Sequence, residues 1–174
     1  MTTNSSQLRK ETLKRRDALS ASQVKESSAG VYEQLVRLDE VKKARTIFAY
    51  VSFRSEIATF RLIERMMQDG KRVTVPITHV KEKRLDAIHI TSLEEDLIPG
   101  YCNIPEPRAE LYNSKIVEPE EIDVVLLPGS VFDKRGGRFG YGGGFYDRFV
   151  SAIPAATRIG LAYDLQVVEL LDLQ

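Results

Sequence analysis

The segment from residue 122 to residue 150 constrains the fold most, because it places a strand, a glycine-crowded connection and a helix start in direct succession. The apolar run at 122–127 predicts a buried strand, and residues 147–150 predict the first turn of a helix. Seven of the chain's eleven glycines lie between them, within 128–148. Glycine suits positions where the backbone takes a positive φ or approaches a ligand closely. Successive free N–H groups ahead of a helix form a concave site that suits phosphate.

The side chains among these glycines favour phosphate binding over the alternative, a flexible surface loop. The run at 140–144 is neither a Walker motif, which needs Gly-Lys-Ser/Thr, nor a dinucleotide fingerprint after the first strand. Arginines and aromatic residues are interleaved with the glycines, whereas a linker carries Ser, Thr or Asn. Arg135, Arg138 and Arg148 supply cations. Asp147 offers a carboxylate of the kind that holds Mg²⁺.

The order of apolar and amphipathic segments predicts an α/β fold. Ser20 and Gln23 have the spacing of a capping box at the start of a second helix. Strands that alternate with helices imply a mostly parallel sheet with helices on both faces. We therefore expect a single domain over residues 1–174, with a Rossmann-like three-layer α/β structure. Helices are expected at 6–19, 21–38, 59–68 and 147–152, strands at 46–51, 72–76, 85–90, 122–127 and 157–162, a solvated hairpin tip at 81–84, and mostly loop at 99–121.

The composition is ordinary for a globular protein and argues against several classes of function. With 25 basic and 25 acidic residues the formal net charge is zero, so we expect no attraction to nucleic acid or to a membrane. No apolar run approaches the roughly 20 residues that span a bilayer, and the N-terminus lacks a signal-peptide core. The single cysteine, Cys102, fits a reducing cytoplasm and is expected to be small and semi-buried. His79 and His89 have strand-like surroundings, so a histidine metal centre is not expected.

Residues 128–148 resemble the signature of the 5-formyltetrahydrofolate cyclo-ligase family, also called methenyltetrahydrofolate synthetases. The family pattern is Pro-Gly-x-x-Phe-Asp-x-x-Gly-x-Arg-x-Gly-x-Gly-x-Gly-x-Tyr-Asp-Arg, and so many fixed residue types at fixed spacing make a match specific. The matching residues are Pro128, Gly129, Phe132, Asp133, Gly136, Arg138, Gly140, Gly142, Gly144, Tyr146, Asp147 and Arg148. The likeness extends over nearly the whole chain, including the basic N-terminal helix, the strand that leads to Glu56 and the segment 103–107.

The resemblance implies an enzyme that cyclises 5-formyltetrahydrofolate to 5,10-methenyltetrahydrofolate, with ATP and Mg²⁺ as cofactors and ADP and phosphate as products. A formyl oxygen is a poor leaving group, so it is first phosphorylated; N10 then adds to the activated carbon and phosphate departs. Such phosphoryl transfer depends on positioning and charge stabilisation, which explains a site rich in arginine and glycine without an obvious nucleophile. The expected partner is this small-molecule substrate, and the chain is expected to be a monomer or a homodimer.

The resemblance also assigns site residues. Arg9 matches a family arginine that contacts ATP, whereas the family's lysine position falls on Ser5, and Lys10 is a candidate replacement. Val51 and Glu56 match substrate contacts, although the helix dipole alone also favours a glutamate near a helix start. The catalytic candidates are Arg138, Tyr141 and Asp147, with Asp147 also on the metal. The cofactor-binding candidates are Arg9, Lys10, Arg135, Arg138, Phe139, Gly140, Tyr141, Gly142, Gly143, Gly144, Phe145 and Tyr146, of which Tyr141 and Phe145 are also expected to contact the substrate.

Two alternatives and one departure from the family pattern stay open at this point. The first alternative is another α/β phosphate-binding enzyme, such as a sugar-phosphate isomerase or a coenzyme A transferase relative. Such an enzyme needs a carboxylate or histidine base beside the carbon that loses a proton, and the sequence shows no such pairing. The second alternative is a nucleotide-binding remnant without activity. Family members usually continue into a His-Asp segment and a last strand, whereas this chain stops after 169–174. The resemblance therefore predicts the loss of a sheet element and of a second acidic residue near the metal.

Overall fold

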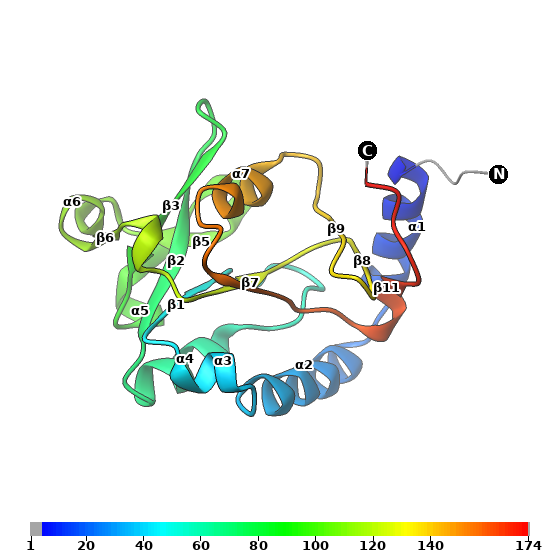
Figure 1. Ribbon diagram of the computed structural model, residues 1–174, viewed down its shortest axis with the longest axis horizontal. Coiled ribbons are helices and arrows are strands. Elements are labelled where there is room, and N and C mark those ends of the chain that lie inside the picture. Colours follow the sequence, from blue (N-terminus) through cyan, green and yellow to red (C-terminus); the bar gives the residue numbers. More distant parts are fainter. Residues whose placement is uncertain (1–4, 174) are drawn as a thin grey trace.

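A six-stranded sheet forms the centre of the computed structural model, which describes residues 5–173 (Figure 1). Four strands run parallel, β2 and β3 form an antiparallel hairpin, and β6 joins antiparallel to β3. The sheet confirms the prediction of a mostly parallel arrangement. The strand order is β10 (Thr157–Gly160), β7 (Val124–Leu127), β1 (Thr46–Ala49), β2 (Arg72–His79), β3 (Arg84–His89) and β6 (Ile116–Val117).

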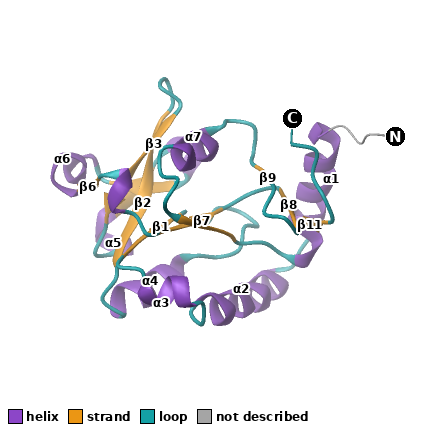
Figure 2. Ribbon diagram, in the orientation of Figure 1, coloured by secondary structure: helices purple, strands orange, loops and turns teal. Residues whose placement is uncertain are grey.

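Helices cover both faces of this sheet, as expected (Figure 2). One face is covered by α2 (Ala21–Leu35), α3 (Asp39–Lys43) and α4 (Phe60–Gln68). The other face is covered by α7 (Phe145–Ser151), which is two residues longer at its start than the expected helix. The arrangement is a three-layer α/β structure.

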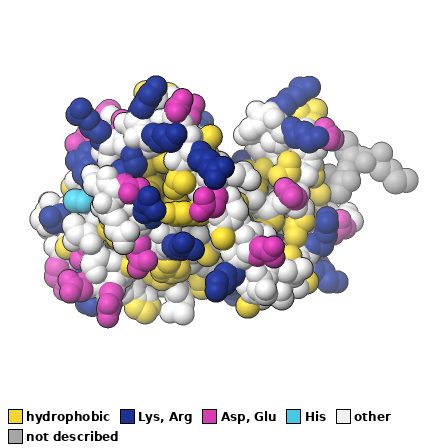
Figure 3. All heavy atoms as spheres, turned by 90° about the horizontal axis from the view of Figure 1, so that it is seen from below, with side chains coloured by type: hydrophobic (Ala, Val, Ile, Leu, Met, Phe, Trp, Pro, Cys, Tyr) yellow, Lys and Arg dark blue, Asp and Glu magenta, His cyan; other side chains and the backbone are white. Residues whose placement is uncertain are grey.

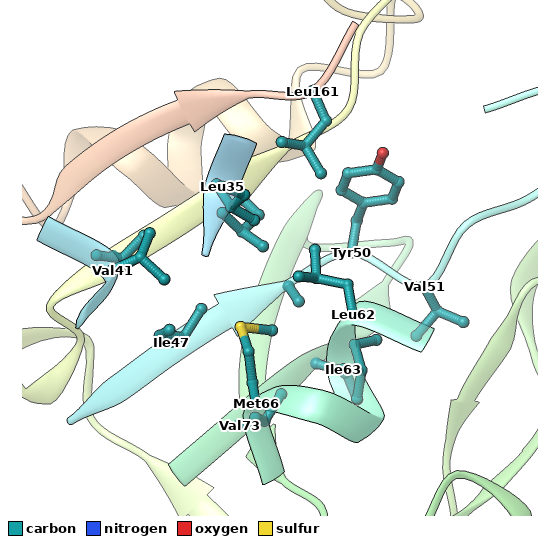
Figure 4. Packing of buried hydrophobic residues seen from close by; sticks show 14 of the residues in the cluster. Leu35, Val41, Ile47, Tyr50, Val51, Leu62, Ile63, Met66, Val73 and Leu161 are labelled. Atoms are coloured by element: carbon teal, nitrogen blue, oxygen red, sulfur yellow. The ribbon is translucent and has the colours of Figure 1, made fainter. Parts of the chain in front are cut away.

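Successive residues of the central strands point to opposite faces and build two cores. In β1, Ile47 belongs to the core under α2 and α4, whereas Phe48 packs against Phe149 of α7, with ring centroids 4.4 Å apart. This is the pattern of a strand buried on both sides. Figure 4 shows the first core, where residues from α2, α4 and the strands converge: Leu35, Ile47, Leu62, Ile63, Met66 and Val73.

The predicted capping box at the start of α2 is present. The Gln23 N–H donates to Ser20 Oγ (3.1 Å), and the Ser20 N–H donates to Gln23 Oε1 (2.8 Å). The helix ends at Leu35, earlier than expected, and α3 follows as a separate short helix. Leu38 has extended backbone angles between the two helices, and this break lets α3 place Val41 in the core.

The glycine-crowded connection after β7 is not one continuous loop, which corrects the prediction. Within it, β8 (Val131–Asp133) and β9 (Arg138–Phe139) form a hairpin, and β11 (Val167–Val168) pairs with β8 in a second sheet. Strands of two or three residues are too short for their period to show in a sequence. At the hairpin turn the Asp133 carboxylate accepts the N–H groups of Arg135 (2.9 Å) and Gly137 (2.7 Å).

The segment 99–121, expected to be mostly loop, contains more structure than that. It holds the edge strand β6, and β4 (Leu97–Pro99) pairs with β5 (Pro105–Pro107) in a short ribbon. Cys102 is exposed rather than semi-buried, because it lies in the surface turn of this ribbon with a φ of 53°. Residues 80–83 form the exposed hairpin tip that the charged run predicts. The remaining short helices are α5 (Leu93–Asp96), η1 (Tyr101–Asn103), η2 (Ala109–Leu111), α6 (Tyr112–Lys115) and η3 (Pro119–Glu121).

The N-terminal helix α1 (Ser5–Asp17) lies at one end of the sheet, beside the small sheet and η4 (Asp164–Gln166). The surface is hollowed between the part of the molecule near the N-terminus and the larger body (Figure 3). Within residues 5–173 none of the helices combines the length and the apolar character that a membrane crossing needs.

Candidate functional site

The carboxyl ends of β1 and β7 meet where the strand order of the sheet reverses. From β1 the chain continues to β2 on one side, whereas β7 and β10 lie on the other side. In open α/β sheets such a reversal leaves a crevice at the strand ends, and ligands bind there. Residues 50–57 follow β1, and the glycine connection at 128–148 follows β7. We define the candidate site by these two segments and the side of α1 that faces them.

A buried arginine of α1 ties the two segments together. Arg16 is 5% exposed; its Nη1 donates to the Tyr141 hydroxyl (2.8 Å) and the Gly129 carbonyl (3.3 Å), and its Nε donates to Ser55 Oγ (3.0 Å). The Tyr141 hydroxyl in turn donates to Glu56 Oε1 (2.7 Å). Arg16 is therefore linked through the Tyr141 hydroxyl, which follows β7, to the Glu56 carboxylate, which follows β1.

Burial shifts the titration of the groups in this network. Burial raises the pKa of Glu56 above its ordinary value, and the hydrogen bonds from Tyr141 and from the Phe53 N–H (2.8 Å) offset part of that shift. Burial likewise raises the pKa values of Tyr141 and Tyr146, and the charge of Glu56 raises both further. The two phenols therefore stay protonated at neutral pH, and the Tyr141 hydroxyl donates its proton in the hydrogen bond to Glu56.

The glycine run contains backbone conformations that other residues rarely adopt. Gly142 has a φ of +100° and Gly144 a φ of +71°. A Cβ at Gly142 would meet nothing within 4 Å, whereas a Cβ at Gly143 would lie 2.7 Å from the Phe145 ring. Space beside the backbone, together with successive peptide N–H groups, is what a phosphate group needs in order to approach the main chain.

Arg138 and Asp147, two of the catalytic candidates, form an ion pair. The Nη2 of Arg138 lies 2.5 Å from Asp147 Oδ1, and its Nη1 donates to the Pro128 carbonyl (2.9 Å). The Arg138 side chain is only 10% exposed, whereas that of Asp147 is 68% exposed. The protein therefore holds Arg138 in place and leaves Asp147 open to solvent. Among residues 5–173 no three His, Cys, Asp or Glu side chains gather in a group that would hold a metal ion alone.

Comparison with known proteins settles the family. The model of the 5-formyltetrahydrofolate cyclo-ligase family matches residues 1–173. The chain belongs to this family. It is 33% identical over 169 residues to the 5-formyltetrahydrofolate cyclo-ligase of Haemophilus influenzae, a match that covers 94% of this chain and 87% of that protein. It is 30% identical over 166 residues to the Escherichia coli K12 protein of the same description, covering 92% and 88% of the two chains.

Solved structures agree with this membership in the cyclo-ligase family, a family of ligase enzymes. The NMR structure of Aquifex aeolicus 5,10-methenyltetrahydrofolate synthetase is 30% identical, has a TM-score of 0.83, and is matched over 97% of this chain and 82% of that chain. The 5,10-methenyltetrahydrofolate synthetase of Mycoplasma pneumoniae has a TM-score of 0.75 at 23% identity, with 98% and 92% covered, and shows the same fold.

The cations that the cyclo-ligase resemblance assigns to ATP lie in different surroundings. The Arg9 guanidinium lies over the Phe139 ring, 4.9 Å from its centroid, and its Nε is buried without a hydrogen-bond partner among the described residues. Lys10 is exposed on the same helix, which begins at Ser5. Arg135 is exposed at the tip of the β8–β9 hairpin. Arg9 and Arg138 are therefore partly buried and held by their surroundings, whereas Lys10 and Arg135 are exposed, and phosphate binding by any of the four stays a prediction.

The residues expected to contact the substrate differ in accessibility. Glu56 and Tyr141 lie together in the network around Arg16. Val51 is 3% exposed and belongs to the core, with its side chain among the apolar residues of Figure 4. Phe145 is half-buried, and its ring centroid lies 6.3 Å from that of Tyr101. The structure gathers Glu56 and Tyr141, and a substrate contact of Val51 stays a prediction.

Two residues that organise the site were missed by the sequence reasoning. Arg16 follows Arg9 by seven residues, two helical turns, so both side chains share one side of α1, with the buried Thr12 between them. That polar stripe was the available signal. Gln166 is 1% exposed and donates from Nε2 to the carbonyl oxygens of Gly129 (2.8 Å) and Ser130 (3.1 Å). No local pattern in the sequence marks this glutamine.

Proposed function

We propose that the chain catalyses the ATP- and Mg²⁺-dependent cyclisation of 5-formyltetrahydrofolate to 5,10-methenyltetrahydrofolate, with release of ADP and phosphate. The observation that carries the proposal is the juxtaposition of the Glu56–Tyr141–Arg16 network with an open glycine run at the carboxyl ends of β1 and β7. Two relatives that share 30% or more of their residues with this chain carry the name of this activity. We place the activity in the cytoplasm, where an exposed thiol such as that of Cys102 stays reduced.

The residues present fit the triphosphate of ATP. The buried Nε of Arg9 lacks a partner among the described residues, and such a donor needs an acceptor. The open space at Gly142 lets a phosphate oxygen reach the peptide N–H groups. Arg138 adds a charge-assisted donor next to the run. When bound, ATP supplies the phosphoryl group that turns the formyl oxygen into a good leaving group.

A magnesium ion fits this site only together with phosphate oxygens. Asp147 supplies one exposed carboxylate, and Mg²⁺ commonly binds one or two carboxylates, substrate phosphates and water. Asp147 is already paired with Arg138. We therefore propose that Asp147 would hold the metal and that Arg138 would hold a phosphate oxygen. In the pair, each side chain compensates the charge of the other.

The folate end of the site is built around Glu56. Its carboxylate is oriented by the Phe53 N–H on one oxygen and the Tyr141 hydroxyl on the other. A carboxylate held in this way accepts hydrogen bonds from the ring N–H groups that a folate offers. Arg16 donates to the Tyr141 hydroxyl, and that contact supports the group which orients the Glu56 carboxylate. Preorganised groups of this kind hold the two reacting parts of a substrate at a productive distance.

Growth of the methenyl product's absorbance tests the proposal directly. Protein, ATP, Mg²⁺ and 5-formyltetrahydrofolate are mixed, and each component is omitted in turn. We expect product only in the complete mixture, with one ADP released for each methenyl group formed. ATP binding without product would identify a nucleotide-binding remnant, and ATP hydrolysis that does not depend on the folate would point to another phosphate-transfer activity. Either result would refute the proposed function.

A further inference from the structure

A buried serine underlies the start of the glycine run. Ser130 is 0% exposed, and its hydroxyl lies 3.0 Å from both the Phe139 and the Gly140 carbonyl oxygens, to which it donates. Its peptide N–H also donates to the Phe139 carbonyl (2.8 Å). Within residues 5–173 the Gly140 carbonyl has no other donor, so the serine hydroxyl alone fixes the direction of that carbonyl.

These hydrogen bonds also determine where two N–H groups point. In a planar trans peptide the C=O and the N–H point in opposite directions. The Phe139 carbonyl shares its peptide with the Gly140 N–H, and the Gly140 carbonyl shares its peptide with the Tyr141 N–H. Because both carbonyls point toward Ser130, both N–H groups point away from it. Neither N–H donates a hydrogen bond to any of the described residues.

Two arginines lie beside this pair of N–H groups. A Cβ added at Gly140 would be 3.2 Å from Nη1 of Arg138, so the Arg138 guanidinium adjoins the first of the two peptides. The Arg9 guanidinium lies over the Phe139 ring, and its buried Nε has no partner among residues 5–173. Successive N–H groups form a concave anion site, and guanidinium groups beside it add charge-assisted donors. Together these groups suit the oxygens of a phosphate.

A buried glutamine holds the backbone of this serine. Gln166 is 1% exposed, and its Nε2 donates to the carbonyls of Ser130 (3.1 Å) and Gly129 (2.8 Å), while its Oε1 accepts the Tyr163 N–H (3.1 Å). Both polar atoms of the amide are therefore in use. The residue that directs the glycine run is thus itself fixed by a side chain of η4.

We propose that Ser130 is a positioning residue for phosphate binding, because its hydroxyl aims the N–H groups of Gly140 and Tyr141 at a phosphate of ATP. This inference rests on the proposed function, since that function makes a triphosphate the ligand of the run. Tyr141 then serves both ends of the site, with its N–H on the phosphate and its hydroxyl on Glu56 (2.7 Å). One residue thereby connects the phosphoryl donor with the folate that receives it.

Amide chemical shifts of the isotope-labelled protein test this proposal without turnover. Inorganic tripolyphosphate is titrated into the parent, Ser130→Ala and Ser28→Ala. Ser28 is a matched control, because it is also buried and its hydroxyl oxygen accepts a backbone N–H, that of Ala58 (2.9 Å), outside the glycine run. We expect the probe to shift the amide signals of Gly140 and Tyr141 in the parent and in the control. In Ser130→Ala the shift at Tyr141 should be lost, and the probe should bind roughly tenfold more weakly.

The conservative variant Ser130→Thr keeps the hydroxyl and should restore both the shift and the affinity. Equal shifts and affinities in Ser130→Ala and Ser28→Ala would overturn the proposal. A loss that threonine does not restore, in a variant that unfolds like the parent, would also overturn it, because the effect would then come from packing. So would a parent in which tripolyphosphate shifts neither amide.

Failure of the proposed function gives a different result. A parent that shows both amide shifts but forms no methenyl product keeps the positioning role of Ser130 and lacks the proposed activity. A parent that forms the product, with a Ser130→Ala variant that keeps the same KM for ATP, contradicts the positioning role alone. We expect instead that Ser130→Ala raises KM for ATP roughly tenfold, in line with the loss of probe affinity, whereas Ser28→Ala leaves it unchanged.

Discussion

The network around Arg16 predicts a measurable coupling between Arg16 and Tyr141. Arg16→Met removes three hydrogen bonds from a buried cation, whereas Tyr141→Phe removes the hydroxyl and keeps the ring, whose centroid lies 5.6 Å from the guanidinium. A hydrogen bond to a charged group contributes about 1.5–3 kcal/mol. Tyr141 is 47% exposed, so water replaces part of the loss, and we take the low end of that range. We expect a coupling free energy of about 1–2 kcal/mol between the two positions.

Urea unfolding of the parent, both single variants and the double variant yields this coupling. Arg16→Met alone should lower the free energy of unfolding by about 3 kcal/mol, because the charge-assisted hydrogen bonds of Arg16 are lost. The loss is not larger because the Gly129 carbonyl keeps a second donor in Gln166. Arg16→Lys serves as the control that keeps the charge but not the planar fork, and it should recover only part of the loss. If the losses of unfolding free energy in the two single variants add up to the loss in the double variant to within about 0.3 kcal/mol, the two side chains do not interact. The account of the site would then fail.

Three further predictions concern the ligands and the pH. Arg138→Ala should weaken ATP binding by about 1.5–3 kcal/mol in calorimetry, and an unchanged ATP affinity would argue against Arg138 as a phosphate ligand. Asp147→Asn frees Arg138 from its ion pair, so this variant should bind ATP at least as well as the parent without Mg²⁺ and should need more Mg²⁺ for activity. Gly142→Val should reduce both ATP affinity and the melting temperature, because its φ of +100° strains any β-branched residue, and normal values of both would mean that the loop is merely flexible. Burial raises the pKa of Glu56 in the folded protein above its ordinary value of 4.5. The contribution of Glu56 to stability is therefore complete at a pH below 4.5 and is lost as the pH rises through the folded pKa. The stability of the parent relative to Glu56→Gln should therefore fall between acid and neutral pH in urea unfolding, and a rise would contradict the burial argument.

The architecture was predictable from the sequence wherever a helix or strand is long enough for its apolar residues to repeat at the characteristic spacing. The helix at α2, with its Ser20–Gln23 capping box, and the parallel strands β1 and β7 carry clear patterns. The β8–β9 hairpin and the edge strand β6 do not, because two or three residues contain no period and their pairing is decided by distant partners. The exposure of Cys102 was missed for a related reason, since the β4–β5 ribbon that carries its turn is equally short.

The site was predictable to the extent that its chemistry is contained in one segment. Arg138 and Asp147 both belong to that segment and were candidates from the sequence, whereas their ion pair is seen only in the structure. Arg16 and Gln166 act on Gly129 from remote positions, and only the folded chain shows that they converge. The cavity between α2 and the segment 54–62 is likewise formed by two segments that are separate in the sequence.

The length of chain between Arg16 and its partners also determines when the site is formed during synthesis. Arg16 is 113 residues from Gly129 and 125 residues from Tyr141. A 13-residue helix such as α1 is marginal by itself in water, so it depends on those late partners. At about 5–20 residues per second a ribosome takes on the order of ten seconds to supply them. Strands β1 and β2 and helices α2 and α4 emerge during that interval, so the nascent chain has part of its core well before it has an assembled crevice.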